Sequence, residues 1–292
     1  MACAGSAPLP AKAVELNRTG IEALTAGDLE TADARFTLAL EYSPTFVDAL
    51  TNQGLVELQR GNFERARQLL ERARRLNADL PQPHHGLGVL EEREGRPDRA
   101  SRHYYEALRV DPGFVPARAN LARLLYDSGY LEEALVQFKR LSEVAPTDAS
   151  GYVGLATTLL RLERRDEASD AIAAGRRAAP ESKELTILQA REAIHAGHWQ
   201  EASTLLSPLA AERDDLAVAA LGWLAVTELA QDHARAAIGA AQRALQLAPD
   251  DPVSTLALGQ ALLRLGDPSA QAWLERAQKL APGARLALHS GP

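Results

Sequence analysis

Alanine recurs along this chain at a fixed interval, and that interval limits the folds available to it more than any other feature. Six alanines follow one another in steps of 34 residues, at Ala32, Ala66, Ala100, Ala134, Ala168 and Ala202. Two more follow at Ala237 and Ala270, after steps of 35 and 33 residues. Repetition at such a period is typical of supersecondary units stacked on one another. We therefore expect a repeat array rather than one or two globular domains.

Glycine and proline keep the same period in other registers. The step of 34 residues also joins the first four of Gly27, Gly61, Gly95, Gly129 and Gly197, and the fifth follows after two steps. A glycine at such a place can take the left-handed conformation that ends a helix. Prolines, which cannot continue a helix, close most units, at Pro44, Pro112, Pro146, Pro180, Pro249 and Pro282. The spacing predicts an all-α fold with two helices per unit, joined by short turns.

The order of these residues resembles the tetratricopeptide repeat, a helix-turn-helix unit. The third unit shows the pattern most fully, with Leu87, Gly88, Gly95, Ala100, Tyr104, Ala107 and Pro112. The resemblance implies a right-handed α-solenoid of eight units, preceded by a flexible tether at 1–12 and followed by a short tail at 284–292. The units are placed at 13–46, 47–80, 81–114, 115–148, 149–182, 183–217, 218–250 and 251–283.

The net charge and the hydropathy of the chain argue against nucleic acid as a partner and against a membrane-spanning segment. The net charge at pH 7 is −7 and the isoelectric point is about 5.6, which argues against binding to a nucleic-acid backbone. No apolar run reaches the roughly 20 residues that a membrane-spanning helix needs. The sequence therefore predicts a protein partner, with no nucleic acid and no transmembrane segment.

No group of residues forms a catalytic, cofactor or metal motif. His84 and His85 are neighbours and so face different ways on a helix, while His195 and His198 lie on either side of the helix-ending Gly197. We expect these histidines, and acidic pairs such as Glu91 and Glu92, to lie on solvated surfaces. The sequence contains no phosphate-binding loop and no nucleophile elbow. It predicts a non-catalytic protein with no cofactor and no metal site.

The resemblance also indicates where a partner would bind. In tetratricopeptide proteins the first helix of each unit lines a concave groove that holds a protein or an extended peptide. The matching positions here are Asn52, Gln59, His85, Arg93, Asn120, Arg123, Tyr126, Arg161, Arg191 and His195. A continuous ladder of asparagines, another device of the family, is not expected, because Arg18, Gly86 and Gly154 interrupt Asn52 and Asn120.

Two interpretations of the groove arginines stay open. Guanidinium groups bind carboxylates through paired hydrogen bonds, so Arg93, Arg123, Arg161 and Arg191 are candidates for holding an acidic peptide. Tyr126 would add flat apolar contact area. Alternatively, the arginines pair with nearby Glu92 and Asp127, in which case they contribute little to binding.

The single cysteine, Cys3, bears on the compartment. Small residues surround it and a loose stretch follows, as at the start of a mature bacterial lipoprotein. If a signal peptide preceded it, Cys3 would be a lipidation site, and the protein would be a periplasmic or outer-membrane scaffold that helps to assemble a pilus, a secretin or an exporter. Otherwise the thiol is unimportant, and the chain is a cytoplasmic regulatory module that partners an enzyme or a secretion substrate.

The C-terminal end is a second candidate surface. Repeat arrays normally need a polar cap at the end, and the residues after Pro282 are too few to form a capping helix. Trp273 and Leu274, with Leu286 and Leu288 in the tail, would then leave apolar area at this end. Either the tail covers that area, or a partner or a second copy of the chain does, which predicts self-association.

Overall fold

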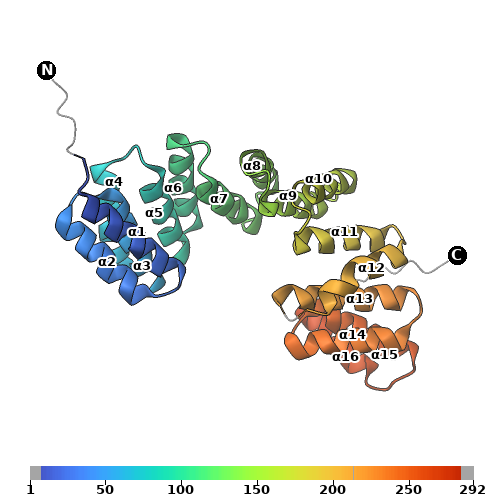
Figure 1. Ribbon diagram of the computed structural model, residues 1–292. Helices are drawn as coiled ribbons and strands as arrows, with labels where there is room; N and C mark the ends of the chain where they lie inside the picture. The colour runs from blue at the N-terminus through green and yellow to red at the C-terminus, as the bar shows by residue number, and fades with distance from the viewer. Residues whose placement is uncertain (1–7, 213, 284–292) are drawn as a thin grey trace. The chain divides into compact units, whose positions relative to one another are not determined.

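The computed structural model describes residues 8–212 and 214–283, and over these residues it contains sixteen α-helices and no β-strand (Figure 1). The predicted all-α helical-repeat fold is confirmed. The helices belong to two compact units, residues 1–144 and 145–292, with four helical pairs in each. Within each unit the helices of a pair pack against each other, and successive pairs stack on one another.

The first unit contains α1 (Ala11–Thr25), α2 (Leu29–Tyr42), α3 (Val47–Gln59), α4 (Phe63–Leu76), α5 (Pro81–Arg93), α6 (Pro97–Val110), α7 (Val115–Asp127) and α8 (Leu131–Val144). The second contains α9 (Ala149–Arg161), α10 (Arg165–Ala178), α11 (Lys183–His195), α12 (Trp199–Ala210), α13 (Asp215–Ala230), α14 (Ala234–Leu247), α15 (Pro252–Arg264) and α16 (Ala270–Leu280). We call the odd-numbered helices inner and the even-numbered helices outer, after the order within each repeat.

The turn inside each pair follows the predicted glycine register. Gly27 has a φ of +79°. The next backbone N–H, that of Asp28, donates to the carbonyl of Ala23 at 2.9 Å, which is the Schellman closure of a helix end. Glu163 and Asp232 stand where glycine is missing and still adopt φ values of 60° and 64°. The turn is therefore retained at these two positions at the cost of local backbone strain.

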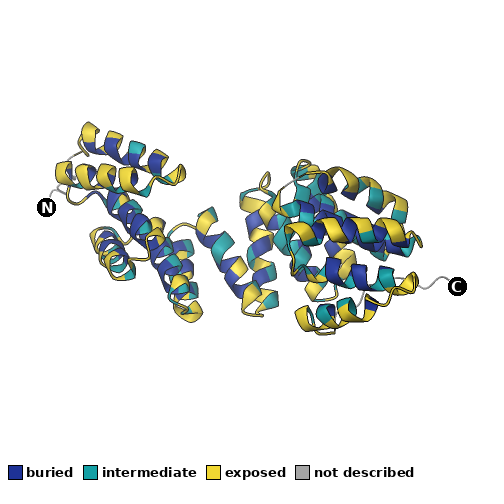
Figure 2. Ribbon diagram, turned by 90° about the horizontal axis from the view of Figure 1, so that it is seen from below, coloured by how far each residue is buried: buried dark blue, intermediate teal, exposed yellow. Residues whose placement is uncertain are grey.

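Packing within a pair depends on the small residues of the register. The alanines of the 34-residue series are almost fully buried, from Ala32 at 0% exposure to Ala270 at 2%. Phe36 and Tyr104, from outer helices, lie directly against Gly20 and Gly88 of inner helices, where a Cβ would overlap the ring. Buried residues accordingly fall on the helix faces turned towards neighbouring helices (Figure 2).

The two ends of the chain are described only in part. Helix α1 begins at Ala11, directly after Pro10 and two residues before the expected start of the repeat array at residue 13, while Cys3 lies outside the described residues. At the other end, Trp273 is half-buried beneath the Arg276 guanidinium, which is 5.4 Å from its ring centroid, and Leu274 packs on Gly259. Leu286 and Leu288 also lie outside the described residues, so self-association through this end stays a prediction.

Candidate protein-binding surface on the inner helices

The residues expected to bind a partner are divided between the two units. Asn52 and Gln59 lie on α3, His85 and Arg93 on α5, and Asn120, Arg123 and Tyr126 on α7, all in the first unit. Arg161 ends α9, and Arg191 and His195 lie on α11, in the second unit. Inner helices carry all ten residues. In the first unit Asn120 contacts His85, and Asn52 and Arg123 hydrogen-bond residues of neighbouring inner helices, so the surface is described from that unit.

Two amide hydrogen bonds link successive inner helices of the first unit. The Asn52 side-chain N–H donates to Asn17 Oδ1 at 3.1 Å, joining α3 to α1. The Asn120 amide nitrogen lies 3.0 Å from His85 Nε2, joining α7 to α5. Each pair is 35 residues apart, one more than the repeat. A ladder of residues 34 apart therefore contains neither link.

His85 is held as a neutral hydrogen-bond acceptor. Its ring centroid lies 5.8 Å from that of Tyr104 and 5.7 Å from that of Phe114. Burial among these rings lowers the pKa of His85 to about 4, so the imidazole is uncharged at pH 7. Since the amide nitrogen of Asn120 donates, we assign Nε2 as the acceptor and place the ring proton on Nδ1.

The expectation that the histidines of α5 are solvated is wrong. His84 is only 7% exposed and its Nδ1 has no hydrogen-bond partner among the described residues. His85 is half-buried. The repeat pattern marks the apolar positions of a helix but cannot show that two polar rings lie against its neighbours.

The groove arginines differ in the contacts that they make within the chain. The Arg123 guanidinium contacts Glu92 at 2.5 Å and Asp127 at 3.1 Å, as the pairing interpretation expects. Arg191 stacks over Trp223, with its guanidinium carbon 4.8 Å from the ring centroid. Arg93 is exposed, and no hydrogen bond or ion pair ties it to any other described residue. Arg93 thus differs from Arg123 and Arg191 in having no bonded neighbour among the described residues.

Glu92 holds Arg123 in place by accepting hydrogen bonds both from Arg123 and from a buried tyrosine. It accepts a hydrogen bond from the buried Tyr104 hydroxyl through one carboxylate oxygen and from Arg123 through the other. Asn120 Nδ2 lies 3.5 Å from the same hydroxyl. Burial and the hydrogen bond to Glu92 raise the pKa of Tyr104, so the hydroxyl stays protonated and acts as a donor. A polar cluster of α5, α6 and α7 thus supports the surface.

Sequence reasoning missed one ionic cluster entirely. Glu91, expected to be solvated, has a side chain that is only 3% exposed. It accepts hydrogen bonds from Arg67 at 2.7 Å and from Arg96 at 2.5 Å, and both arginines also contact Glu94. A related cluster surrounds Glu57, one repeat earlier. The spacing of 34 residues between Glu57 and Glu91 was the available signal.

The described part of the chain holds no group of three histidine, cysteine, aspartate or glutamate residues placed to bind a metal ion. Its helices are also too short or too polar to cross a bilayer.

Comparison with known proteins identifies the repeats. Family models described as tetratricopeptide repeat match residues 17–81, 93–155, 187–252 and 228–285. A 117-residue stretch is 33% identical to cellulose synthase operon protein C of Xanthomonas axonopodis pv. citri, covering 39% of this chain and 8% of that protein. A 137-residue stretch is 28% identical to the CTR9 homologue of Arabidopsis thaliana, covering 46% of this chain and 13% of that protein. The chain thus aligns with only small parts of both relatives.

Solved structures show the same fold at low identity. The APC/C hetero-tetramer Cut9–Hcn1 matches with a TM-score of 0.65 and 15% identity, over 92% of this chain and 53% of that chain. Pseudomonas aeruginosa PilF matches with a TM-score of 0.62 and 19% identity, over 75% of this chain and 97% of that chain. With the family models covering more than half of its length, the chain is a member of the tetratricopeptide repeat family, whose members bind peptides or proteins.

Proposed function

We propose that this chain is a non-catalytic scaffold that binds an acidic segment of another protein along the exposed face of α1, α3, α5 and α7. The observation that carries the proposal is Arg93, which is exposed at the end of α5 and tied to no other described residue. Such a cation pays no cost of breaking an internal ion pair when a carboxylate arrives. The same reasoning makes Arg123, which already contacts Glu92 and Asp127, a weaker contributor.

The amide pairs support an extended ligand. A carboxamide has two N–H donors and an oxygen with two lone pairs. The hydrogen bond to Asn17 uses one donor of Asn52 and leaves the other donor and the oxygen. The contacts with His85 and Tyr104 use the donors of Asn120 and leave its oxygen. An extended chain offers complementary backbone N–H and C=O groups, so these side chains can bind it without regard to sequence.

The remaining residues of the proposed surface are secondary contacts. Gln59 is exposed at the end of α3, and Tyr126 is half-buried on α7. Arg161, Arg191 and His195 belong to the inner helices of the second unit. We propose that they form a separate contact surface there.

The first prediction concerns Arg93. Random 15-residue peptides selected by phage display on the full chain should be enriched in aspartate and glutamate. Arg93→Glu should weaken binding of the selected peptides by about tenfold or more, because it replaces an attraction by a repulsion. Arg102→Glu is the matched control, since Arg102 is an exposed arginine of the outer helix α6. The affinity of this variant for the selected peptides should stay within about twofold of that of the unmodified chain.

Affinities would be measured by fluorescence anisotropy of labelled peptides, with the fold of each variant checked by circular dichroism. Peptides without acidic enrichment, or an equal loss for Arg93→Glu and Arg102→Glu, would remove the proposed role of α5.

A finer proposal is that the protein acts in the bacterial envelope, in assembly of a pilus, a secretin or an exporter. It is supported by the small residues around Cys3 and by the partial match to a bacterial cellulose synthase operon protein. The competing proposal is a cytoplasmic regulatory module. The two differ in the chemical state of Cys3.

The second prediction tests this difference. In protein purified from its native host, the envelope proposal expects an N-terminal peptide that starts at Cys3 and carries a thioether-linked diacylglycerol. Mass spectrometry of that peptide checks the expectation, and Cys3→Ser should move the protein from the detergent phase to the aqueous phase. An unmodified Cys3 preceded by other residues would instead support the cytoplasmic module.

A further inference from the structure

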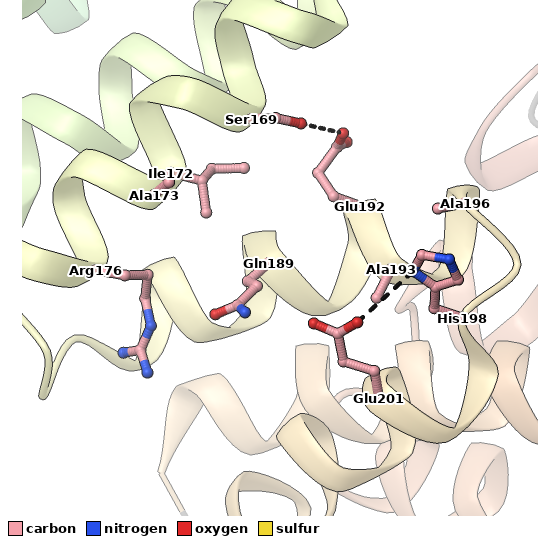
Figure 3. Close-up of a pocket in the computed structure, with 10 residues that line it drawn as sticks. All are labelled: Ser169, Ile172, Ala173, Arg176, Gln189, Glu192, Ala193, Ala196, His198 and Glu201. Carbon is pink, nitrogen blue, oxygen red and sulfur yellow. Dashed lines mark hydrogen bonds and ion pairs between the residues drawn. The ribbon is translucent and has the colours of Figure 1, made fainter.

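The second unit contains a pocket of about 300 Å³ between α10, α11 and α12 (Figure 3). Ile172 and Ala173 line it from α10, Ala193 lies on α11, and Glu201 enters from α12. Its volume is at the lower end of the range for ligand pockets and suits a single side chain. The pocket-lining residues on α11 and directly after it follow helical spacing, as Glu192 and Ala196 do. They therefore lie on a different face of the helix from Arg191 and His195.

Comparison with earlier repeats explains why this space is open. Three repeat lengths earlier, the equivalent positions of Ala193 and Ala196 hold Glu91 and Glu94. The place of Ser169 on α10 is held there by Arg67 on α4. Between α4 and α5, the Arg67 guanidinium forms ion pairs with both glutamates.

Between α10 and α11 the long side chains are replaced by short ones, so this space stays open. Among the described residues, no arginine therefore takes here the part that Arg67 takes three repeats closer to the N-terminus.

The charges around the pocket favour a cation. Glu192 accepts a hydrogen bond from the Ser169 hydroxyl at 3.1 Å. Its Oε1 also forms an ion pair with Arg165 Nη1 at 3.7 Å. Glu201 lies 3.7 Å from His198 Nδ1 (Figure 3). The one arginine that lines the pocket, Arg176, donates to the backbone carbonyl of Pro180 instead of to either carboxylate. Two carboxylates thus border a space with an apolar floor.

We propose that this pocket receives an arginine side chain of a partner protein, at a site distinct from the surface on the inner helices of the first unit. The aliphatic stem of the arginine packs on Ile172 and Ala193, and its guanidinium hydrogen-bonds Glu192 and Glu201. The guest takes the place that Arg67 fills from within the chain between α4 and α5. A planar guanidinium suits two carboxylates from different helices better than a compact ammonium does.

The probe is N-acetyl-arginine-N-methylamide, titrated into the ¹⁵N-labelled full chain and followed by amide chemical shifts. We expect saturable shifts centred on residues 192–201. The citrulline analogue, which has the same shape without the charge, should bind about tenfold or more weakly. Glu192→Gln combined with Glu201→Gln should cause a similar loss. Arg93→Glu should leave binding unchanged, which separates this proposal from the proposed function.

Ser169→Arg is the decisive variant. It restores the arginine of the earlier repeat, whose guanidinium then occupies the pocket from α10, so the probe should lose its binding. Ser207→Arg makes the same chemical change at an exposed position of α12 outside the pocket, and it should keep the affinity within about twofold. Equal binding of the citrulline analogue, shifts centred elsewhere, or equal affinities for Ser169→Arg and Ser207→Arg would overturn the proposal.

Discussion

Replacing Tyr104 by alanine is expected to lower the free energy of unfolding of the first unit by about 3–5 kcal/mol, the range for large buried aromatic side chains. Tyr104 is 0% exposed and is among the largest fully buried side chains. Its ring lies on Gly88, and its hydroxyl donates to Glu92. The change therefore opens a cavity between α5 and α6 and removes a hydrogen bond to a partly buried carboxylate.

Tyr105 provides a matched control for this prediction. It is the next residue on α6, has the same chemistry and is 45% exposed. Tyr105→Ala should change the free energy of unfolding by no more than about 1 kcal/mol. Urea unfolding would be combined with hydrogen exchange of the amides of α5–α7, because a repeat protein does not always unfold in one step. A similar cost for both variants would mean that the α5–α6 contact is not a main source of stability.

Most of the fold could be predicted from residues whose role is local. Gly27 ends a helix through its own backbone, and Ala32 packs where any larger side chain would separate two helices. Such roles recur in every repeat and therefore leave a period in the sequence. Even the exceptions kept the predicted geometry, since Glu163 and Asp232 adopt the left-handed conformation of the missing glycines.

The candidate site was predictable only in part, because its chemistry depends on contacts between repeats. Arg93 and Arg123 were equally good candidates in the sequence, and only the placement of Glu92 and Asp127 distinguishes them. The pocket of the second unit left no motif at all. It arises where short side chains such as Ala193 replace long ones, and an alanine in a helical repeat is typical of core packing.

The ionic cluster around Glu91 allows the second large effect to be predicted. Glu91→Gln should lower the free energy of unfolding of the first unit by about 2–4 kcal/mol at pH 7, because it removes the more buried of the two carboxylates that the partly buried Arg67 and Arg96 share. Glu41→Gln, at an exposed position of α2, is the matched control and should cost about 0.5 kcal/mol or less.

The difference in free energy of unfolding between the unmodified protein and Glu91→Gln should depend on pH, because it follows from the pKa of Glu91. Burial alone would raise that pKa, but the hydrogen bonds from Arg96 and Arg67 and their positive charges outweigh burial and lower it. A lowered pKa in the folded state stabilises the protein above the unfolded pKa of about 4.3, and this contribution is lost as the pH falls through the folded value. Urea unfolding from pH 7 down to pH 3 should therefore show that the free energies of unfolding of the unmodified protein and of the Glu91→Gln variant converge below about pH 4. A constant difference over that range would contradict the assignment.

Later repeats of the chain indicate a substitution that should destabilise the first unit less than Glu91→Gln does. One and two repeat lengths after Glu91, the same position is held by Leu125 and Leu159, which are 9% and 3% exposed. This place in the repeat thus accepts either an ionic cluster or an apolar side chain. Replacing a buried ion pair by apolar residues is often neutral, whereas removing one partner is costly. Glu91→Leu combined with Arg67→Leu should therefore be less destabilising than Glu91→Gln alone, measured by the same urea unfolding. If the double variant were the less stable of the two, the cluster would be contributing specific stability that apolar packing cannot replace.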